Sequence, residues 1–155
     1  MVRKLPFYNM ATFRHFTDIQ AWQEARAFNR SLYGLMNSMR PPCDVTLKNQ
    51  LSRASLSIMN NIAEGFARGT DAQFAQFLTI ARGSAAEVES MLFVVEDIAP
   101  DLQLKLADLR IQLDLIISLI AKLTTYLRKS QARESEDTYC VQETPGLPDF
   151  RTSGP

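Results

Sequence analysis

The sequence predicts an all-α protein, an antiparallel up-down-up-down four-helix bundle, within its 155 residues. Three observations lead to this prediction. Four long segments repeat apolar residues every three or four positions, which is the spacing of one face of an α-helix. Short segments that contain Pro or Gly separate them, and short connections make consecutive helices antiparallel. No segment alternates apolar and polar residues over a useful length, so no strand is predicted.

The bundle is expected to occupy residues 17–130, between an N-terminal arm of residues 1–16 and a tail of residues 131–155. The tail is polar, acidic and punctuated by Pro and Gly, so it is predicted to be disordered. The arm is too aromatic for a solvated tail, and we expect it to pack on its own or a neighbouring subunit. Its aromatic residues are Phe7, Tyr8, Phe13 and Phe16.

The first helix is predicted to begin at Thr17, with Gln20 completing a capping box, and to end at Arg40 before two prolines. The second runs from Asp44 or Thr46, either of which could cap it, to Arg68. Their core-facing stripes contain Ala21, Ala25, Phe28, Leu32, Leu35, Met36 and Met39 in the first helix, and Leu47, Leu51, Ala54, Ile58 and Ile62 in the second.

The third helix is predicted over 72–98, after a C-terminal glycine at Gly69 and a cap at Thr70 or Asp71. The tight turn at Gly69 sets the register of helices two and three. The core-facing stripe of the third helix contains Phe74, Phe77, Leu78, Ala81, Ala85, Val88, Leu92 and Val95.

In this register, Gly83 and Ser84 should face residues 54–56, and small side chains there would let the two helices approach closely. The same register places Arg53 beside Glu87. We therefore predict an ion pair between the two helices.

The fourth helix is predicted to start at Pro100-Asp101 and to extend to about Ser130. Its main stripe is a nearly continuous row of Leu and Ile, which suits a bundle core. A second apolar stripe lies on the far side and indicates a subunit interface. This second stripe contains Leu104, Ile111, Leu115, Leu119 and Tyr126.

The sequence offers little for catalysis or for a cofactor. A di-iron bundle site needs two Glu-x-x-His pairs, and the chain has one histidine, His15, before the bundle. A nucleophilic pair would require His15 to meet Cys43 or Cys140, all in segments expected to be irregular. Without a Gly-rich phosphate loop either, we expect neither an enzyme nor a metal or other cofactor.

No apolar run is long enough to span a membrane, and the N-terminus lacks the apolar core of a secretion signal. We therefore expect a cytoplasmic protein with no membrane partner and with reduced cysteines.

Charge distribution permits contact with nucleic acid. The net charge is zero, but residues 1–130 carry 15 basic and 12 acidic side chains, whereas residues 131–155 carry 2 and 5. On a single chain these basic residues are diluted by acidic ones, and the default interpretation is an ordinary solvated surface. In a symmetric oligomer, however, every patch is repeated, so a weak local field could become a strong ring of positive charge. The candidate nucleic-acid contacts are Arg26, Arg30, Lys48, Arg68, Arg82, Lys122, Arg128 and Lys129.

A polar row follows one side of the second helix and has two interpretations. It could be a binding strip that offers amides, hydroxyls and both charges. It could instead be a polar network that fixes helix register, with Arg53 and Glu64 paired to helical neighbours, and we favour this second interpretation. The row contains Gln50, Arg53, Ser57, Asn60, Asn61, Glu64 and Arg68.

These residues also carry a family resemblance. The run Asn61-Ile62-Ala63-Glu64-Gly65, followed by Gly83-Ser84 and then Glu87, strongly resembles the bacterial 23S rRNA-intervening-sequence proteins over about residues 15–128. The matching residues, which we expect to be structural, are Trp22, Arg53, Ser57, Asn61, Glu64, Gly65, Arg68, Gly83, Ser84 and Glu87.

The resemblance implies a cytoplasmic bundle that assembles as a homo-oligomeric ring, with a pentamer favoured, and it brings no catalytic residue. The family is similar in fold to the accessory variability determinant of diversity-generating retroelements, which binds nucleic acid. Our first hypothesis is therefore a non-enzymatic ring that binds structured RNA or other nucleic acid. The alternative is an oligomeric scaffold that binds a protein partner and has no nucleic-acid role.

Overall fold

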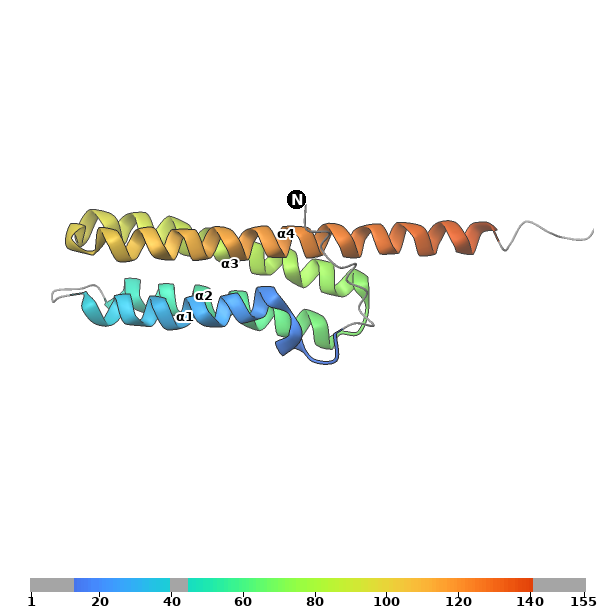
Figure 1. Cartoon of the computed structure of the whole chain (residues 1–155), viewed down its shortest axis with the longest axis horizontal. Helices are drawn as coiled ribbons and strands as arrows, with labels where there is room; N and C mark the ends of the chain where they lie inside the picture. Colours follow the sequence, from blue (N-terminus) through green and yellow to red (C-terminus); the bar gives the residue numbers. More distant parts are fainter. Residues whose placement is uncertain (1–12, 40–44, 141–155) are drawn as a thin grey trace, which may run out of the picture.

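A computed structural model describes residues 13–39 and 45–140, with side chains as far as Ala132. Within these residues the chain forms four α-helices and no strand, so the predicted four-helix bundle is confirmed. α1 packs against α2 and α4, and α3 packs against the same two helices (Figure 1). The helices are α1 (Gln20–Ser38), α2 (Val45–Ala67), α3 (Asp71–Ile98) and α4 (Gln103–Cys140).

The core consists of the apolar stripes that the periodicity predicts, except that Leu47 and Phe77 are only half-buried. Phe28 of α1 and Phe74 of α3 have no exposed surface, and neither have the leucines that surround them. Burial of one such side chain stabilises a fold by about 1.5–3 kcal/mol, so this core supplies most of the driving force for the bundle. Fully buried leucines from all four helices are Leu32, Leu51, Leu78, Leu92 and Leu106.

The start of α1 differs from the prediction. A short 3-10 helix, η2 (Phe16–Asp18), precedes it, and the capping box joins His15 and Asp18 instead of Thr17 and Gln20. The backbone N–H of His15 donates to Asp18 Oδ2 at 3.0 Å. Ile19 is then extended and almost fully buried, so the α-helix begins only at Gln20. Two residues of the predicted arm, Phe13 and Phe16, pack against this chain's own core.

The connection between α1 and α2 is described only at its edges. α1 ends at Ser38, two residues before the predicted end at Arg40, and α2 has begun by Val45, so Thr46 does not cap it. The remaining predictions for this connection and for both termini lie outside the described residues. They concern Phe7, Tyr8, Arg40, Cys43, Asp44 and residues 141–155.

The turn between α2 and α3 forms as predicted. Gly69 has a φ of +77°, a left-handed conformation that costs a glycine little because it has no Cβ. Thr70 then caps α3, since its hydroxyl oxygen accepts a hydrogen bond from the backbone N–H of Gln73 at 3.3 Å.

The register of α2 and α3 is close to the prediction, but the position of closest approach is not. The hydroxyls of Ser57 and Ser84 share a hydrogen bond of 2.8 Å, so Ser84 faces a residue just beyond 54–56. Gly83 is exposed, and a Cβ there would meet nothing within 4 Å. A Cβ on Gly65 would instead lie 2.6 Å from Phe77 Cβ, so of these two glycines only Gly65 lies where the helices are too close for a larger residue.

The predicted ion pair between Arg53 and Glu87 is wrong. Both side chains are exposed, and neither forms an ion pair in the part of the chain that the structure describes. Water already solvates both charges, so an exposed pair would gain little from contact. One hydrogen bond, between the hydroxyls of Ser57 and Ser84, joins the two helices where we had expected charges to do so.

α4 is longer than predicted and begins after a short 3-10 helix, η3 (Pro100–Leu102). It continues ten residues past Ser130 to Cys140, so it projects beyond the bundle (Figure 1). The prediction of disorder from residue 131 is therefore wrong for 131–140. Those residues are polar but contain neither Gly nor Pro, and nothing in them opposes continuation of the helix.

An ion pair joins α3 and α4 near their connecting turn. The Arg110 guanidinium donates a hydrogen bond to Glu96 Oε2 at 2.6 Å and lies 4.5 Å from the centre of the Phe93 ring. This hydrogen bond holds the pKa of Glu96 below its ordinary value of 4.5 and raises the pKa of Arg110. The three side chains together form a clasp between the two helices.

The clasp makes stability depend on pH. Because the folded pKa of Glu96 is depressed, its stabilisation is fully present above the unfolded pKa and is lost as pH falls through the folded pKa. Glu96→Gln should therefore unfold at lower urea than the wild type at pH 7, and the difference should shrink below pH 4.5. Asp97→Asn is the control, because Asp97 forms no ion pair among the described residues. If Glu96→Gln lowers the urea midpoint by the same amount at pH 7 and below pH 4.5, the ion pair with Arg110 does not cause the pH dependence.

Candidate nucleic-acid interface

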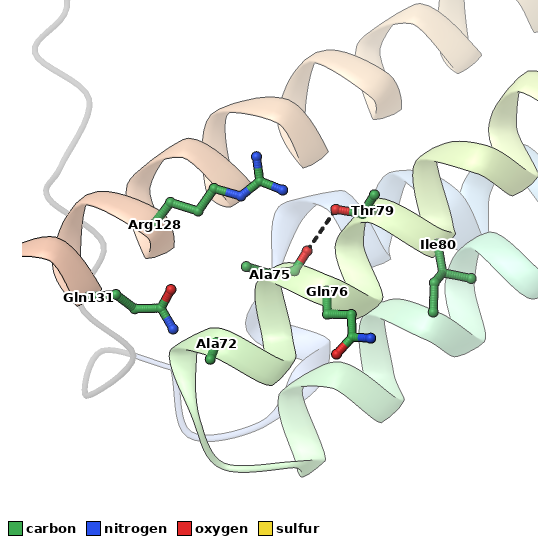
Figure 2. Close-up of a pocket in the computed structure, with 7 residues that line it drawn as sticks. All are labelled: Ala72, Ala75, Gln76, Thr79, Ile80, Arg128 and Gln131. Atoms are coloured by element: carbon green, nitrogen blue, oxygen red, sulfur yellow. Dashed lines mark hydrogen bonds between the residues drawn. The ribbon is translucent and has the colours of Figure 1, made fainter.

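A surface groove lies between the N-terminal half of α3 and the C-terminal half of α4, and we call it the α3/α4 groove. It consists of two neighbouring hollows that share Thr79 and Arg128, the larger with a volume of about 490 Å³. The larger hollow is lined by Thr79, Arg82, Gly83, Ala86, Ala121, Thr124, Thr125 and Arg128, together with Leu78. The smaller, shown in Figure 2, adds Ala72, Ala75, Gln76, Ile80 and Gln131.

Small side chains explain why the groove is open. Gly83, Ala86 and Ala121 do not fill the seam between the two helices. The hydroxyl of Thr79 donates to the carbonyl of Ala75 at 3.0 Å, so it is turned back to its own helix (Figure 2). Thr125 is different, because it is exposed and its hydroxyl forms no hydrogen bond within the described residues.

Two arginines from different helices face this groove. Arg82 and Arg128 are both exposed, and neither forms an ion pair in the described part of the chain. Figure 2 shows the Arg128 side chain extending from α4 above Ala75 and Thr79 of α3. Among the side chains that the structure describes, which end at Ala132, no carboxylate lines either hollow. The two guanidiniums are therefore free to donate charge-assisted hydrogen bonds to an anion.

The α3–α4 hairpin separates its charges along its length. Residues 87–114, at the end that holds the connecting turn, carry seven acidic and two basic side chains. Residues 68–86 and 115–132, at the opposite end, carry five basic and one acidic. The continuation of α4 over residues 133–140 adds one basic and three acidic residues. The stretch of the hairpin that contains the α3/α4 groove is therefore basic, and an acidic stretch of sequence lies on either side of it.

A family model described as 23S rRNA-intervening sequence protein matches residues 17–122. The chain belongs to this family. The match covers η2 through most of the bundle part of α4, so Arg82 lies inside it and Arg128 outside. No curated protein matches the chain with significant similarity.

The structure of this 23S rRNA-intervening sequence protein places two other predicted contact residues against its own side chains. Arg68 forms an ion pair with Glu64 and lies 5.2 Å from the centre of the Phe77 ring. Arg26 lies 5.8 Å from the centre of the Trp22 ring. Both remain exposed, but part of their binding capacity is used within the chain. They are therefore weaker candidates than Arg82 and Arg128.

The other four predicted contacts lie outside the lining of the α3/α4 groove. Lys122 and Lys129 are exposed on α4, in the basic stretch of the hairpin. Arg30 is exposed on α1, and Lys48 is half-buried near the start of α2. The fold therefore groups the α4 lysines with the groove and separates the α1 and α2 residues from it.

The polar row of α2 lines a shallow hollow and also connects α2 to α3. Asn61 Nδ2 donates to the Ser57 carbonyl at 2.8 Å and to its hydroxyl at 3.0 Å, and that hydroxyl bonds to Ser84. Arg53 and Glu64 lie at the rim of this hollow. Glu64 pairs along its own helix with Arg68, whereas Arg53 forms no ion pair among the described residues. The pairing expected for Arg53 is therefore wrong.

The second stripe of α4 divides into two groups. Leu104, Ile111 and Leu115 are 86%, 69% and 42% exposed, so large apolar side chains are left in water on the single chain. Leu119 and Tyr126 are only partly exposed and pack against the core of their own bundle. The surface available to another protein is thus the N-terminal half of the stripe.

Sequence reasoning did not pair Arg82 with Arg128, nor did it single out Thr79 or Thr125. The turn at Pro100 sets which residues of α3 and α4 lie opposite each other, as the turn at Gly69 does for α2 and α3. The same reasoning about register could therefore have predicted that these segments are neighbours. Within the described residues, no three His, Cys, Asp or Glu side chains are grouped as metal ligands. None of the helices described here is both long and apolar enough to cross a membrane.

Proposed function

We propose that this protein binds structured RNA or other nucleic acid in the basic stretch of its α3–α4 hairpin, as a non-enzymatic, ring-forming bundle. The observation that carries the proposal is the α3/α4 groove, which Arg82 and Arg128 both line and which no carboxylate lines within the described residues. Guanidinium forks match the geometry of carboxylate and phosphate, and phosphate is the anion that a nucleic acid supplies.

Electrostatics supports the same part of the molecule. Lys122 and Lys129 add two exposed charges on the same half of α4, and residues 68–86 and 115–132 carry five basic side chains against one acidic. In a cyclic assembly every subunit would present its basic stretch in the same direction. A patch that is modest on one chain would then become a continuous basic surface, which raises both affinity and association rate.

Substitution of the two groove arginines tests the proposal. Arg82→Gln together with Arg128→Gln should weaken binding of a structured RNA and make it less sensitive to salt. Each lost phosphate contact should reduce the slope of log affinity against log salt concentration by about 1. The measurement is fluorescence anisotropy of a labelled RNA hairpin at several salt concentrations, with light scattering to show that the variant keeps its assembly.

The matched control removes the same charge elsewhere. Arg26→Gln together with Arg30→Gln changes two exposed arginines of α1 that lie outside the groove. This control should keep most of the affinity and a salt slope near that of the wild type. An equal loss in both variants would mean that net charge, and not the groove, controls binding. A wild-type protein that binds no RNA at low salt would refute the proposed function.

A protein-interaction scaffold is the second candidate function, and the exposed row of Leu104, Ile111 and Leu115 favours it. Large apolar side chains that share one helix face commonly mark protein interfaces. We propose that this row joins subunits of the ring, with a pentamer favoured by the family resemblance. A single stoichiometric protein that remains bound after nuclease treatment would favour the scaffold function instead.

A further inference from the structure

We infer that the α3/α4 groove binds the phosphate backbone of a double-stranded nucleic acid and does not bind unpaired bases. The inference rests on the proposed function and specifies its ligand. It starts from the side chains that the groove offers. These are two guanidiniums, hydroxyls such as that of Thr125, the amides of Gln76 and Gln131, and small apolar groups.

No aromatic side chain lines the groove among the side chains that the structure describes. Sites that bind single strands use aromatic rings as platforms, each worth about 1–3 kcal/mol per stacked base. Without such rings, a base that leaves its own stack would find only the guanidinium planes of Arg82 and Arg128, and these are better used as donors to phosphate.

The exposed aromatic rings of the described residues lie elsewhere. Tyr33 is on α1, where its hydroxyl shares a hydrogen bond of 2.6 Å with Ser52. Phe93 is at the end of the hairpin that holds the connecting turn, beneath the Arg110 guanidinium. Neither Tyr33 nor Phe93 lines the α3/α4 groove, so a nucleic acid held there by Arg82 and Arg128 would not contact either ring within the groove. Stacking of bases on aromatic rings therefore adds nothing to binding by the described lining of the groove.

A duplex satisfies the donors that are present. Double-stranded nucleic acid carries about one negative charge per 1.7 Å of helix axis in the case of B-DNA, a higher density than one strand offers. Arg82, Arg128 and the Thr125 hydroxyl can donate to phosphate oxygens without opening a base pair. Phosphate contacts carry no direct sequence information. Binding through the groove should thus be nearly independent of sequence.

The test compares one labelled RNA strand of 20 nucleotides, unable to fold on itself, alone and annealed to its complement, with the full-length protein. A second duplex of scrambled sequence is measured in parallel. We expect both duplexes to bind with similar affinity and at least about tenfold more tightly than the single strand. Arg82→Gln with Arg128→Gln should remove most of this preference, whereas the Arg26→Gln, Arg30→Gln control should keep it.

The outcomes separate this inference from the proposed function. If the single strand binds as tightly as the duplex, and the groove substitutions weaken it, nucleic-acid binding stands and the duplex inference is wrong. If the duplex preference survives the groove substitutions, the preference arises at another surface and the inference is again wrong. If neither form binds, the proposed function fails first and the inference falls with it.

Discussion

Replacing Gly65 with alanine should destabilise the bundle by about 1–3 kcal/mol, the usual cost of overpacking a tight site. The added Cβ would lie 2.6 Å from Phe77 Cβ and 2.9 Å from Phe74 Cδ2. Phe77 Cβ is bonded directly to the backbone, so a change of rotamer cannot move it away. α2 and α3 would have to separate, and the fully buried Phe74 ring would lose contacts on both sides.

Gly83→Ala is the matched control. It is the same substitution, also within a helix, and Gly83 belongs to the family motif as Gly65 does. A Cβ at Gly83 meets nothing within 4 Å, so alanine should stabilise α3 by about 0.5–1 kcal/mol through its higher helix propensity. Urea unfolding measured at one protein concentration, so that assembly contributes equally, gives both values. Two changes of the same sign would show that contact between α2 and α3 at Gly65 is not tight.

Substituting glutamate for Leu104, Ile111 and Leu115 should convert the proposed ring into helical monomers. These side chains are exposed on the single chain and none belongs to its buried core, so their replacement should leave the bundle folded. Burial of each in an interface would contribute about 1.5–3 kcal/mol, and three added charges at every contact would oppose association as well. Light scattering should then report a mass near 17.5 kDa, with the circular dichroism of an intact bundle.

Val45 provides the control for this experiment, because Val45 and Ile111 are equally exposed, at 69% each. Ile111→Glu alone should weaken assembly, whereas Val45→Glu on α2 should leave the mass unchanged. If the triple variant unfolds, the stripe supports the bundle itself. If it keeps the mass of the wild type, the row is not the subunit interface and a different protein partner becomes the better explanation for it.

The helices were predictable because each one carries its own signal. Apolar spacing of three and four residues identified the stripes that the structure buries, and Gly69 with Thr70 located the turn between α2 and α3. The errors arose where the sequence is compatible with two local structures. His15 and Asp18 form the capping box that the pattern at Thr17 also offered. α4 continues past Ser130 because a polar composition does not by itself end a helix.

The sequence by itself determined a four-helix bundle with amphipathic helices, and it carried the motif of the 23S rRNA-intervening sequence proteins. Only the tertiary structure decided which motif glycine packs tightly, and which arginines share a groove. Gly65 and Gly83 look alike in sequence, but the space around a Cβ depends on a neighbouring helix. Arg82 and Arg128 are distant in the chain, and the antiparallel packing of α3 and α4 brings them to the lining of one groove.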